Sequence, residues 1–167
     1  KSLLLSDYGA KWAVLNRDDD WFEFFQKRST ADVFTIGKAK GTDATMQRIQ
    51  LTTEGSSEKL VFKEHTLNLH TQLLGEFNLY NATASASVGH LVGLSPEQIE
   101  QGVANLSAVS GRMESVDAGQ DFTVLVDYAY TSDAIEQALK SLRQITTGKI
   151  RIVFGAAGDT DKGKRPL

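Results

Sequence analysis

The chain has 167 residues, of which 41% are hydrophobic, and its formal net charge is −3. A chain of this length can bury a substantial core, either as one domain or as parts of two. The small negative charge gives no sign of a nucleic-acid-binding surface. The absence of cysteine excludes disulfides and thiolate chemistry and is typical of a cytoplasmic protein. No apolar run reaches the length of a membrane span, so we expect no membrane partner.

The front of the chain has the pattern of an α/β protein. Residues 3–5 are expected to end a helix, and residues 12–15 and 33–36 to form short buried strands. An aromatic helix at residues 21–25 lies between these strands, and we expect its rings to join the core. The three aspartates at 18–20 could bind a hard cation, although a solvated turn that caps the next helix is the commoner arrangement.

The middle of the chain has the pattern of an antiparallel sheet. Residues 46–53 and 59–63 alternate loosely between apolar and polar side chains, and they flank the hairpin signal Glu54-Gly-Ser-Ser57. Residues 66–71 alternate strictly, with leucines on one face. These three segments therefore predict a small antiparallel sheet.

Two asparagines mark the beginning of the next element. Gly75-Glu-Phe-Asn-Leu-Tyr-Asn-Ala82 opens a helix that is expected to run to about residue 92. Asn78 and Asn81 are three residues apart, so both amides point to one side of the helix. An amide offers one acceptor and two donors, which suits recognition of a purine edge. The alternative is that Asn78 simply caps the helix.

A change of pattern follows and suggests a domain boundary. Residues 95–98 provide serine, proline and glutamine at the N-cap, N1 and N3 positions, which predicts a second helix with a capping box. Ser110-Gly-Arg112 then interrupts the helical pattern. We therefore place a boundary near Val109, with residues 1–108 in one domain and 109–167 in another.

The last segment has the pattern of a βα unit. Residues 122–126 are apolar and rich in β-branched side chains, which predicts a buried parallel strand. Asp127 follows at the expected carboxyl edge, where it could bind a ligand or only cap a loop. Ser132 is the expected N-cap of a helix. Residues 150–154 are expected to form a second strand, and a glycine-containing loop at 155–161 follows it.

Four motifs in this order resemble the Mur ligase family over nearly the whole chain. They are Gly75-Glu-Phe-Asn-Leu-Tyr-Asn-Ala82, Gly111-Arg-Met-Glu114, Val126-Asp-Tyr-Ala-Tyr-Thr-Ser-Asp-Ala134 and Val153-Phe-Gly-Ala-Ala-Gly-Asp-Thr-Asp-Lys-Gly-Lys-Arg-Pro166. The resemblance implies an α/β fold: the back part of a central ATP-binding domain with a small antiparallel sheet, followed by the start of a Rossmann-like C-terminal domain.

The resemblance implies an ATP-dependent ligase of peptidoglycan biosynthesis, of the branch that adds the third amino acid. The implied substrates are UDP-N-acetylmuramoyl-L-alanyl-D-glutamate and a free amino acid, lysine or diaminopimelate. A substrate carboxylate becomes an acyl phosphate, the incoming amine attacks it, and phosphate leaves. The implied cofactors are ATP and Mg²⁺. We expect a cytoplasmic protein without a nucleic-acid or membrane partner; the sequence leaves the oligomeric state open, with a monomer as the expectation.

The matching positions carry implied roles in nucleotide binding. By resemblance, Asn78 and Asn81 lie against the adenine, and Arg112 and Asp127 hold the ribose and phosphates. Tyr130 belongs to the same nucleotide site, at a position where the family usually has histidine. An arginine presents a forked donor to anionic oxygens, and a carboxylate accepts from ribose hydroxyls, so these residue types suit those roles.

Further roles are implied at the two ends of the chain. Lys1 matches a lysine that is carbamylated in the family, and a carbamate is a carboxylate-like oxygen ligand of the kind that magnesium prefers. Asp159, Thr160, Lys164 and Arg165 match the loop that binds the added amino acid. The family usually has arginine where this chain has Thr160, which leaves the identity of the amino acid open.

One family motif is absent from the printed sequence, namely a Gly-x-x-Gly-Lys-Thr phosphate loop. We therefore expect these 167 residues alone to be inactive. Two other functions remain open: a ligase similar to folylpolyglutamate synthase, and a non-catalytic nucleotide-binding module. The Gly-Arg-Met-Glu motif and the Gly-Asp-Thr-Asp-Lys-Gly-Lys-Arg-Pro motif argue against the folate-type ligase.

Overall fold

The computed structural model describes residues 2–155 and 163. Its main feature is a mixed sheet of five strands in the order β1-β2-β3-β4-β5. The strands are β1 (Trp12–Asn16), β2 (Asp32–Gly37), β3 (Ala44–Leu51), β4 (Ser56–Val61) and β5 (Thr66–Thr71). The predicted antiparallel strands β3 to β5 are confirmed. They continue the parallel strands β1 and β2 in one sheet, because β2 also pairs parallel with the beginning of β3.

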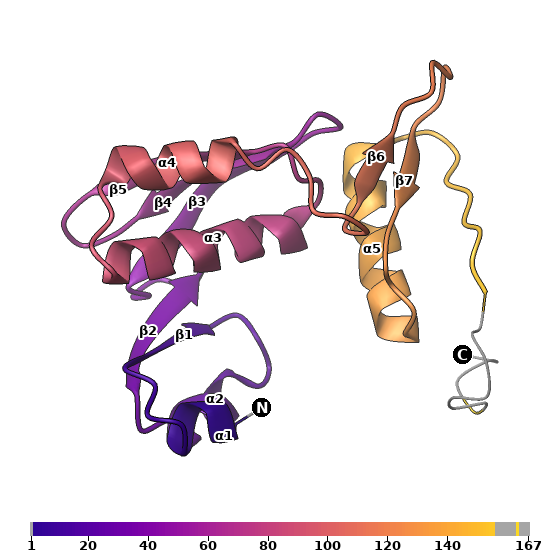
Figure 1. The fold of residues 1–167 in the computed structure, drawn as a ribbon. Helices are drawn as coiled ribbons and strands as arrows, with labels where there is room; N and C mark the ends of the chain where they lie inside the picture. The colour runs from indigo at the N-terminus through magenta and orange to yellow at the C-terminus, as the bar shows by residue number, and fades with distance from the viewer. Residues whose placement is uncertain (1, 156–162, 164–167) are drawn as a thin grey trace.

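Four helices accompany this sheet. They are α1 (Leu3–Ser6), α2 (Phe22–Arg28), α3 (Glu76–Leu91) and α4 (Pro96–Ala104). Helix α3 lies against the sheet, and α4 lies beside it and contacts β5 (Figure 1). The capping box of α4 is confirmed, because Ser95 Oγ accepts from Gln98 N at 3.3 Å and Gln98 Oε1 accepts from Ser95 N at 2.9 Å.

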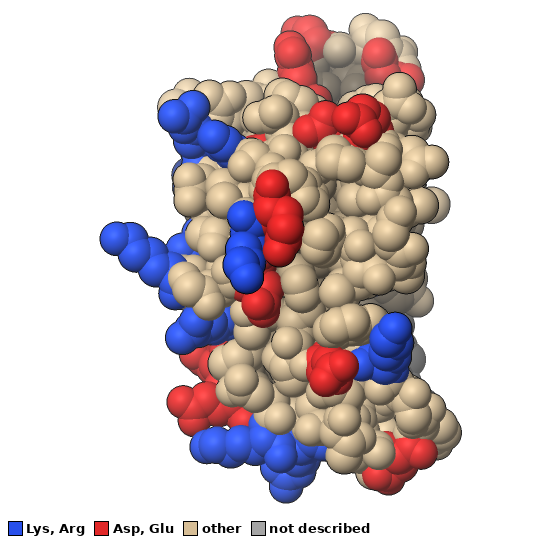
Figure 2. Space-filling view, turned by 90° about the vertical axis from the view of Figure 1, so that its left-hand side faces the viewer, with Lys and Arg blue, Asp and Glu red and all other residues tan. Residues whose placement is uncertain are grey.

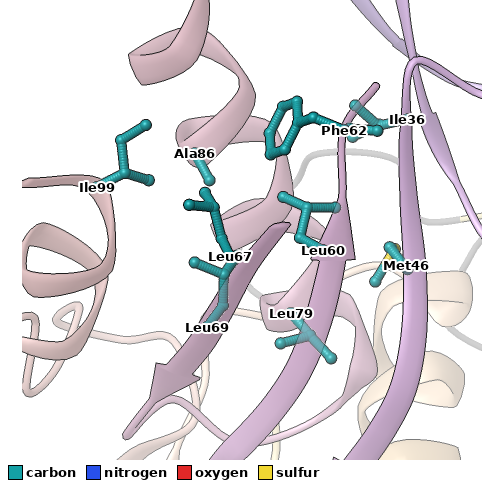
Figure 3. Close-up of a cluster of buried hydrophobic side chains, with 10 residues drawn as sticks. Ile36, Met46, Leu60, Phe62, Leu67, Leu69, Leu79, Ala86 and Ile99 are labelled. Carbon is teal, nitrogen blue, oxygen red and sulfur yellow. The ribbon is translucent and has the colours of Figure 1, made fainter. Parts of the chain in front are cut away.

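The core lies between the sheet and the two helices. Leu60 of β4 and Leu67 and Leu69 of β5 point toward α3 and α4, and all three are fully buried (Figure 3). The alternation of β5 explains this arrangement, since every second side chain faces the helices. Each buried leucine stabilises the fold by about 1.5–3 kcal/mol relative to an exposed one.

Helix α3 is buried on most of its sides, and its buried polar side chains are satisfied locally. Thr83 and Ser87 are both fully buried. Thr83 Oγ1 donates to Leu79 O at 2.9 Å, and Ser87 Oγ donates to Thr83 O at 2.8 Å. These bonds let hydroxyl groups enter the core without the cost of an unpaired donor.

Strand β5 forms one edge of the sheet. At its centre, the backbone N–H of Asn68 donates to Glu100 Oε1 of α4 over 2.6 Å. A side chain from the neighbouring helix thus satisfies a backbone donor that faces away from β4.

The rear of the chain forms a smaller unit with two short strands and one helix. The elements are β6 (Glu114–Val116), β7 (Val124–Val126) and α5 (Ser132–Ile145), and β6 pairs antiparallel with β7 (Figure 1). The prediction of a buried parallel strand at residues 122–126 is therefore wrong. Phe122 is 65% exposed and Val126 is 47% exposed. An apolar run indicates that a segment tends to be buried, but it does not determine which strand the segment pairs with.

Three further expectations differ from the structure. Residues 150–154 form no strand, because no described segment offers them a hydrogen-bonding partner. The N-cap of α5 is Thr131 rather than Ser132, since Thr131 Oγ1 accepts from Ala134 N at 3.2 Å. The rings at the start of α2 do not join the core: Trp21 is 62% exposed and packs edge-to-face on Phe24.

The start of α3, in the front part of the chain, lies close to α5, in the rear part. Gly75, the N-cap of α3, has a φ of +86°, which only glycine adopts without strain. A Cβ at this position would lie 3.2 Å from Ser141 Cβ of α5 and 3.1 Å from Phe77 Cε1. Glycine therefore permits both the turn into α3 and the close approach of α5 (Figure 1).

Within the described residues, the helices are all too short or too polar to cross a lipid bilayer.

Candidate functional site

A groove of about 550 Å³ lies between α3 and α4 and is bounded at one end by residues 106–112. Its wall is mostly apolar, with a few polar side chains from β5, α3, α4 and the segment at residues 106–112. The lining residues are Thr71, Leu73, Asn78, Asn81, Ala82, Ser85, Ala86, Gly89, Leu94, Gln98, Ile99, Gly102, Val103, Leu106, Val109 and Arg112. The structure thus brings three of the predicted nucleotide-binding residues, Asn78, Asn81 and Arg112, to one groove.

Asn78 has a mainly structural place in this groove. Its side chain is 2% exposed, and Nδ2 donates to Leu74 O at 2.9 Å. Its Oδ1 accepts from Asn81 Nδ2 at 3.3 Å. Asn78 therefore stabilises the first turn of α3 through these two hydrogen bonds. It does not cap the helix, because the N-cap residue of α3 is Gly75.

Asn81 is the asparagine that is open to a ligand. It is exposed, and in the described part of the chain its side-chain oxygen accepts no hydrogen bond. Its amide nitrogen is oriented by Asn78, so its oxygen is the atom left to accept a hydrogen bond, and Asn81 lines the groove. An oriented amide of this kind can read one edge of a purine ring.

Arg112 enters the groove from a turn with unusual backbone angles. Gly111 has a φ of +69° and Met113 a φ of +47°. Arg112 N donates to Val109 O at 2.9 Å, whereas the guanidinium group has no hydrogen-bond or ion-pair partner within residues 2–155 and 163. An exposed guanidinium beside an apolar groove is suited to an anionic group of a ligand.

Asp127 does not line the groove, but it holds the turn that carries Arg112. Its Oδ2 accepts from Met113 N at 2.9 Å, and its Oδ1 accepts from Ala129 N at 2.8 Å. Of the two possibilities left open by the sequence, the structure shows the loop-capping one. Each carboxylate oxygen can still accept a second hydrogen bond, so the contact with a ribose stays a prediction.

The other predicted site residues lie away from the groove or outside the described part. Tyr130 is 66% exposed and packs edge-to-face with Tyr128, at 5.8 Å between ring centroids. Its role in nucleotide binding stays a prediction. The remaining candidates, which fall outside the described residues, are Lys1, Asp159, Thr160, Lys164 and Arg165.

The turn with three aspartates contains a contact that the sequence did not reveal. Asp18 Oδ2 accepts from Lys38 N at 2.6 Å and from the hydroxyl of Tyr80 at 2.7 Å. Burial acts to raise the pKa of the Asp18 carboxyl, but these hydrogen bonds outweigh it and hold the pKa below its usual value. Burial and the bond to Asp18 in turn raise the pKa of Tyr80.

The cation-binding alternative for these aspartates finds no support in the described residues. Asp19 Oδ1 accepts from Trp21 N at 2.8 Å at the start of α2, which is the expected capping arrangement. Residues 2–155 and 163 contain no group of three or more His, Cys, Asp or Glu side chains that could hold a metal ion.

A second ionisable group was missed because it lies inside the core. Glu58 of β4 is 4% exposed, and burial raises its pKa to about 7. Its Oε1 is hydrogen-bonded to Thr83 Oγ1, and its Oε2 has no partner in the described part of the chain. The spacing of two residues between Glu58 and Leu60 was the available signal, because in a strand it places both side chains on the same face.

Comparison with known families decides the evolutionary relationship. Residues 1–89 match the model of the Mur ligase middle domain, and residues 111–167 match the Mur ligase, glutamate ligase domain. The chain belongs to the Mur ligase family. The predicted family is therefore confirmed, as is its mixed α/β fold.

Similar proteins cover the same part of the family. A UDP-N-acetylmuramoyl-L-alanyl-D-glutamate–2,6-diaminopimelate ligase of Geobacillus thermodenitrificans is 40% identical over 157 residues, which are 94% of this chain and 32% of that protein. A solved structure of a ligase with the same name gives a TM-score of 0.72 at 27% identity and covers 99% of this chain and 35% of that one. The chain thus spans about a third of the length of these Mur ligases.

A folate-type enzyme shares the fold at lower identity. The folylpolyglutamate synthetase of Lactobacillus casei gives a TM-score of 0.65 at 16% identity, over 82% of this chain and 36% of that one. This likeness shows a common fold and carries no information about substrate.

Proposed function

We propose that these residues are part of an ATP-dependent ligase of peptidoglycan biosynthesis that adds the third amino acid to UDP-N-acetylmuramoyl-L-alanyl-D-glutamate. The observation that carries the proposal is the groove in which Asn81 and Arg112, from two separate family motifs, face the same space. The similarity to diaminopimelate ligases of 35–41% identity supports the same substrate class.

The groove suits a nucleotide in both shape and chemistry. Its apolar wall, with Ile99, Leu106 and Val109, can cover the faces of a purine ring, while Asn81 meets the ring edge. Arg112, which also lines the groove, would then bind the ribose or the phosphates. We also include Asp127 and Tyr130 in the proposed nucleotide site. Asp127 holds the turn that carries Arg112, and Tyr130 lies in the loop that follows Asp127.

The proposed reaction consumes one ATP per amide bond. The substrate carboxylate attacks the terminal phosphate to give an acyl phosphate and ADP, and the amine of the amino acid then displaces inorganic phosphate. Diaminopimelate is favoured as the added amino acid by the names of the similar proteins, and lysine is the alternative. Asp159, Thr160, Lys164 and Arg165 are proposed to contact that amino acid.

Magnesium is included in the proposal on the family relationship. Lys1, as a carbamate, would provide an oxygen ligand for it. The described residues offer no metal-binding cluster, so no residue among them is assigned to Mg²⁺.

The proposal places the enzyme in the cytoplasm as a monomer without a nucleic-acid or membrane partner. Figure 2 shows one face on which lysine and arginine side chains are interspersed with aspartate and glutamate, without a large patch of one sign. This mixed surface and the net charge of −3 support the absence of a nucleic-acid partner. We also propose that residues 1–108 and 109–167 form separate domains; the family matches, which end at residue 89 and resume at 111, support this division.

The decisive experiment begins with the gene sequence on both sides of these codons. A Gly-x-x-Gly-Lys-Thr motif in the complete open reading frame supports the ligase, and its absence supports a non-catalytic nucleotide-binding module. The complete protein is then assayed for phosphate release. Release that requires ATP, UDP-muramoyl dipeptide and diaminopimelate or lysine is the expected result. Release that requires a folate and glutamate would instead identify a folylpolyglutamate-type ligase.

A further inference from the structure

The turn that carries Arg112 adopts a backbone conformation that needs external support. Met113 has a φ of +47°, in the left-handed region that side chains with a Cβ rarely adopt. Such a residue keeps this conformation only where its surroundings impose it. The surroundings here are the burial of the Met113 side chain, which is 5% exposed, and the hydrogen bond from Met113 N to Asp127.

Glu114 supports the same turn from its other side. Its Oε2 accepts from the backbone N–H of Gly111 at 2.9 Å and from Ser110 Oγ at 3.2 Å. Gly111 is also fixed through its carbonyl oxygen, which accepts from Tyr128 N at 2.8 Å. The residues on both sides of Arg112 are therefore held, while the Arg112 guanidinium has no partner in the described part of the chain.

We infer that Glu114 is a positioning residue, whose carboxylate fixes the turn at residues 110–114 so that Arg112 points into the groove beside Asn81. The inference rests on the proposed function for the effect on ATP, but the support of the turn is a separate, measurable property. Glu114 acts as an acceptor: its Oε2 receives both hydrogen bonds, and within the described residues it donates none. A neutral side chain of the same shape can therefore replace it.

The test compares Glu114→Gln with Glu114→Ala in the complete protein. Glutamine keeps an acceptor oxygen for Gly111 N, whereas alanine removes it. Glu114→Ala should raise the KM for ATP roughly tenfold, with kcat and the KM for the muramoyl dipeptide little changed, because the loss of one hydrogen bond is of that order. Glu114→Gln should restore the KM for ATP to within about threefold of the original value.

A double-variant cycle separates positioning from direct contact. If Glu114 acts through Arg112, Glu114→Ala should add almost nothing to the effect of Arg112→Ala on the KM for ATP. Additive effects, or a Gln variant as impaired as the Ala variant, would overturn the inference. Glu136→Ala is the matched control on α5, where Glu136 forms an exposed ion pair with Lys140, and it should leave the KM for ATP unchanged.

Hydrogen exchange provides a readout that does not depend on catalysis. The amide of Gly111 should exchange more slowly in the unchanged protein and in Glu114→Gln than in Glu114→Ala. This result supports the inference even if Arg112→Ala leaves the KM for ATP unchanged, in which case only the proposed nucleotide role fails. Equal exchange rates of the Gly111 amide in all three proteins would overturn the inference about Glu114. If Glu114→Ala does not fold, Ser110→Ala removes one of the two donors and should give a smaller effect of the same kind.

Discussion

The hydroxyl of Tyr80 donates a hydrogen bond to Asp18 over 2.7 Å, although 62 residues separate the two along the chain. Tyr80 lies in the same helix as Asn78 and Asn81, and Asp18 follows β1. The bond therefore ties the helix that faces the groove to the end of the parallel part of the sheet. Lys38 strengthens the connection, since its Nζ lies 2.7 Å from Glu76 Oε1 at the start of α3.

Tyr80→Phe removes only this hydroxyl and should lower the free energy of unfolding by about 1 kcal/mol. This is the contribution of a hydrogen bond to a charged group, reduced because solvent screens the charge. The pKa of Asp18 is lowered in the folded chain, so its contribution is present above the ordinary aspartate pKa of 3.8 and is lost as the pH falls below it. Urea unfolding at pH 7 and pH 3 should show the difference shrinking at pH 3. Tyr8→Phe, at a tyrosine that is 75% exposed, is the control and should change nothing.

Glu58→Gln should stabilise the chain at pH 8 and have little effect at pH 4. Burial raises the pKa of Glu58 from 4.5 to about 7, so folding favours the protonated form. The stability that this group provides is complete below pH 4.5 and declines as the pH rises to about 7. The full decline is at most about 3.5 kcal/mol, from roughly 1.4 kcal/mol for each pKa unit over about 2.5 units.

The measurement for Glu58 is denaturant unfolding of both proteins across this range of pH. Glu54→Gln, at an exposed glutamate of the hairpin, controls for the loss of a negative charge. A constant difference between Glu58→Gln and the unchanged chain from pH 4 to pH 8 would contradict the raised pKa.

Gly75→Ala should destabilise the chain by more than Gly93→Ala. The two glycines have nearly the same φ, +86° and +85°, so alanine is strained by about 1 kcal/mol or more at either position. A Cβ at Gly93 meets nothing within 4 Å, whereas at Gly75 it meets Ser141 and Phe77. Thermal unfolding of the two variants measures the combined cost of the contacts with Phe77 and with Ser141 of α5. Equal losses would show that neither side chain lies this close to Gly75 in solution.

Asn81→Ala and Asp127→Ala test the nucleotide site in the complete protein. Asp127→Ala should weaken the apparent ATP affinity roughly ten- to hundredfold and Asn81→Ala less, as expected for one charged and one neutral hydrogen bond. The KM for the muramoyl dipeptide should change little in either variant. ATP KM values measured after a check of the melting temperatures decide the matter, and unchanged values in both folded variants would remove these assignments.

The 167 residues alone should release no phosphate from ATP. Phosphoryl transfer depends on groups that position and neutralise the phosphates, and the printed sequence has no Gly-x-x-Gly-Lys-Thr loop to do so. The assay is phosphate release from the purified chain with UDP-muramoyl dipeptide and an amino acid. The prediction would be contradicted if phosphate release with the dipeptide exceeded the background measured without it.

Local patterns predicted much of the fold, because the forces that set them act over a few residues. Serine, proline and glutamine at residues 95–98 predicted the capped start of α4, and the strict alternation at residues 66–71 predicted β5. The grouping of Asn78 and Asn81 followed from helical spacing. Their place beside Arg112 in one groove was implied only by the family resemblance.

Features that depend on distant partners could not be read from the sequence. Val124–Val126 has the composition of a buried strand, yet its partner is the short strand Glu114–Val116. Asp18 gives no local sign that Tyr80 will reach it. The positive φ of Met113 is imposed by Asp127 and by burial rather than by any preference of methionine for that conformation.

The carboxylate of Glu100, bound to the backbone N–H of Asn68, protects the outer edge of the sheet from pairing with a second molecule. The outer edge of β5 would otherwise offer a row of free backbone groups to which a strand from a second copy could add. With the central donor occupied and α4 lying alongside, an incoming strand would lose a hydrogen bond and collide with a helix. A single glutamate thereby opposes intermolecular strand addition at this edge.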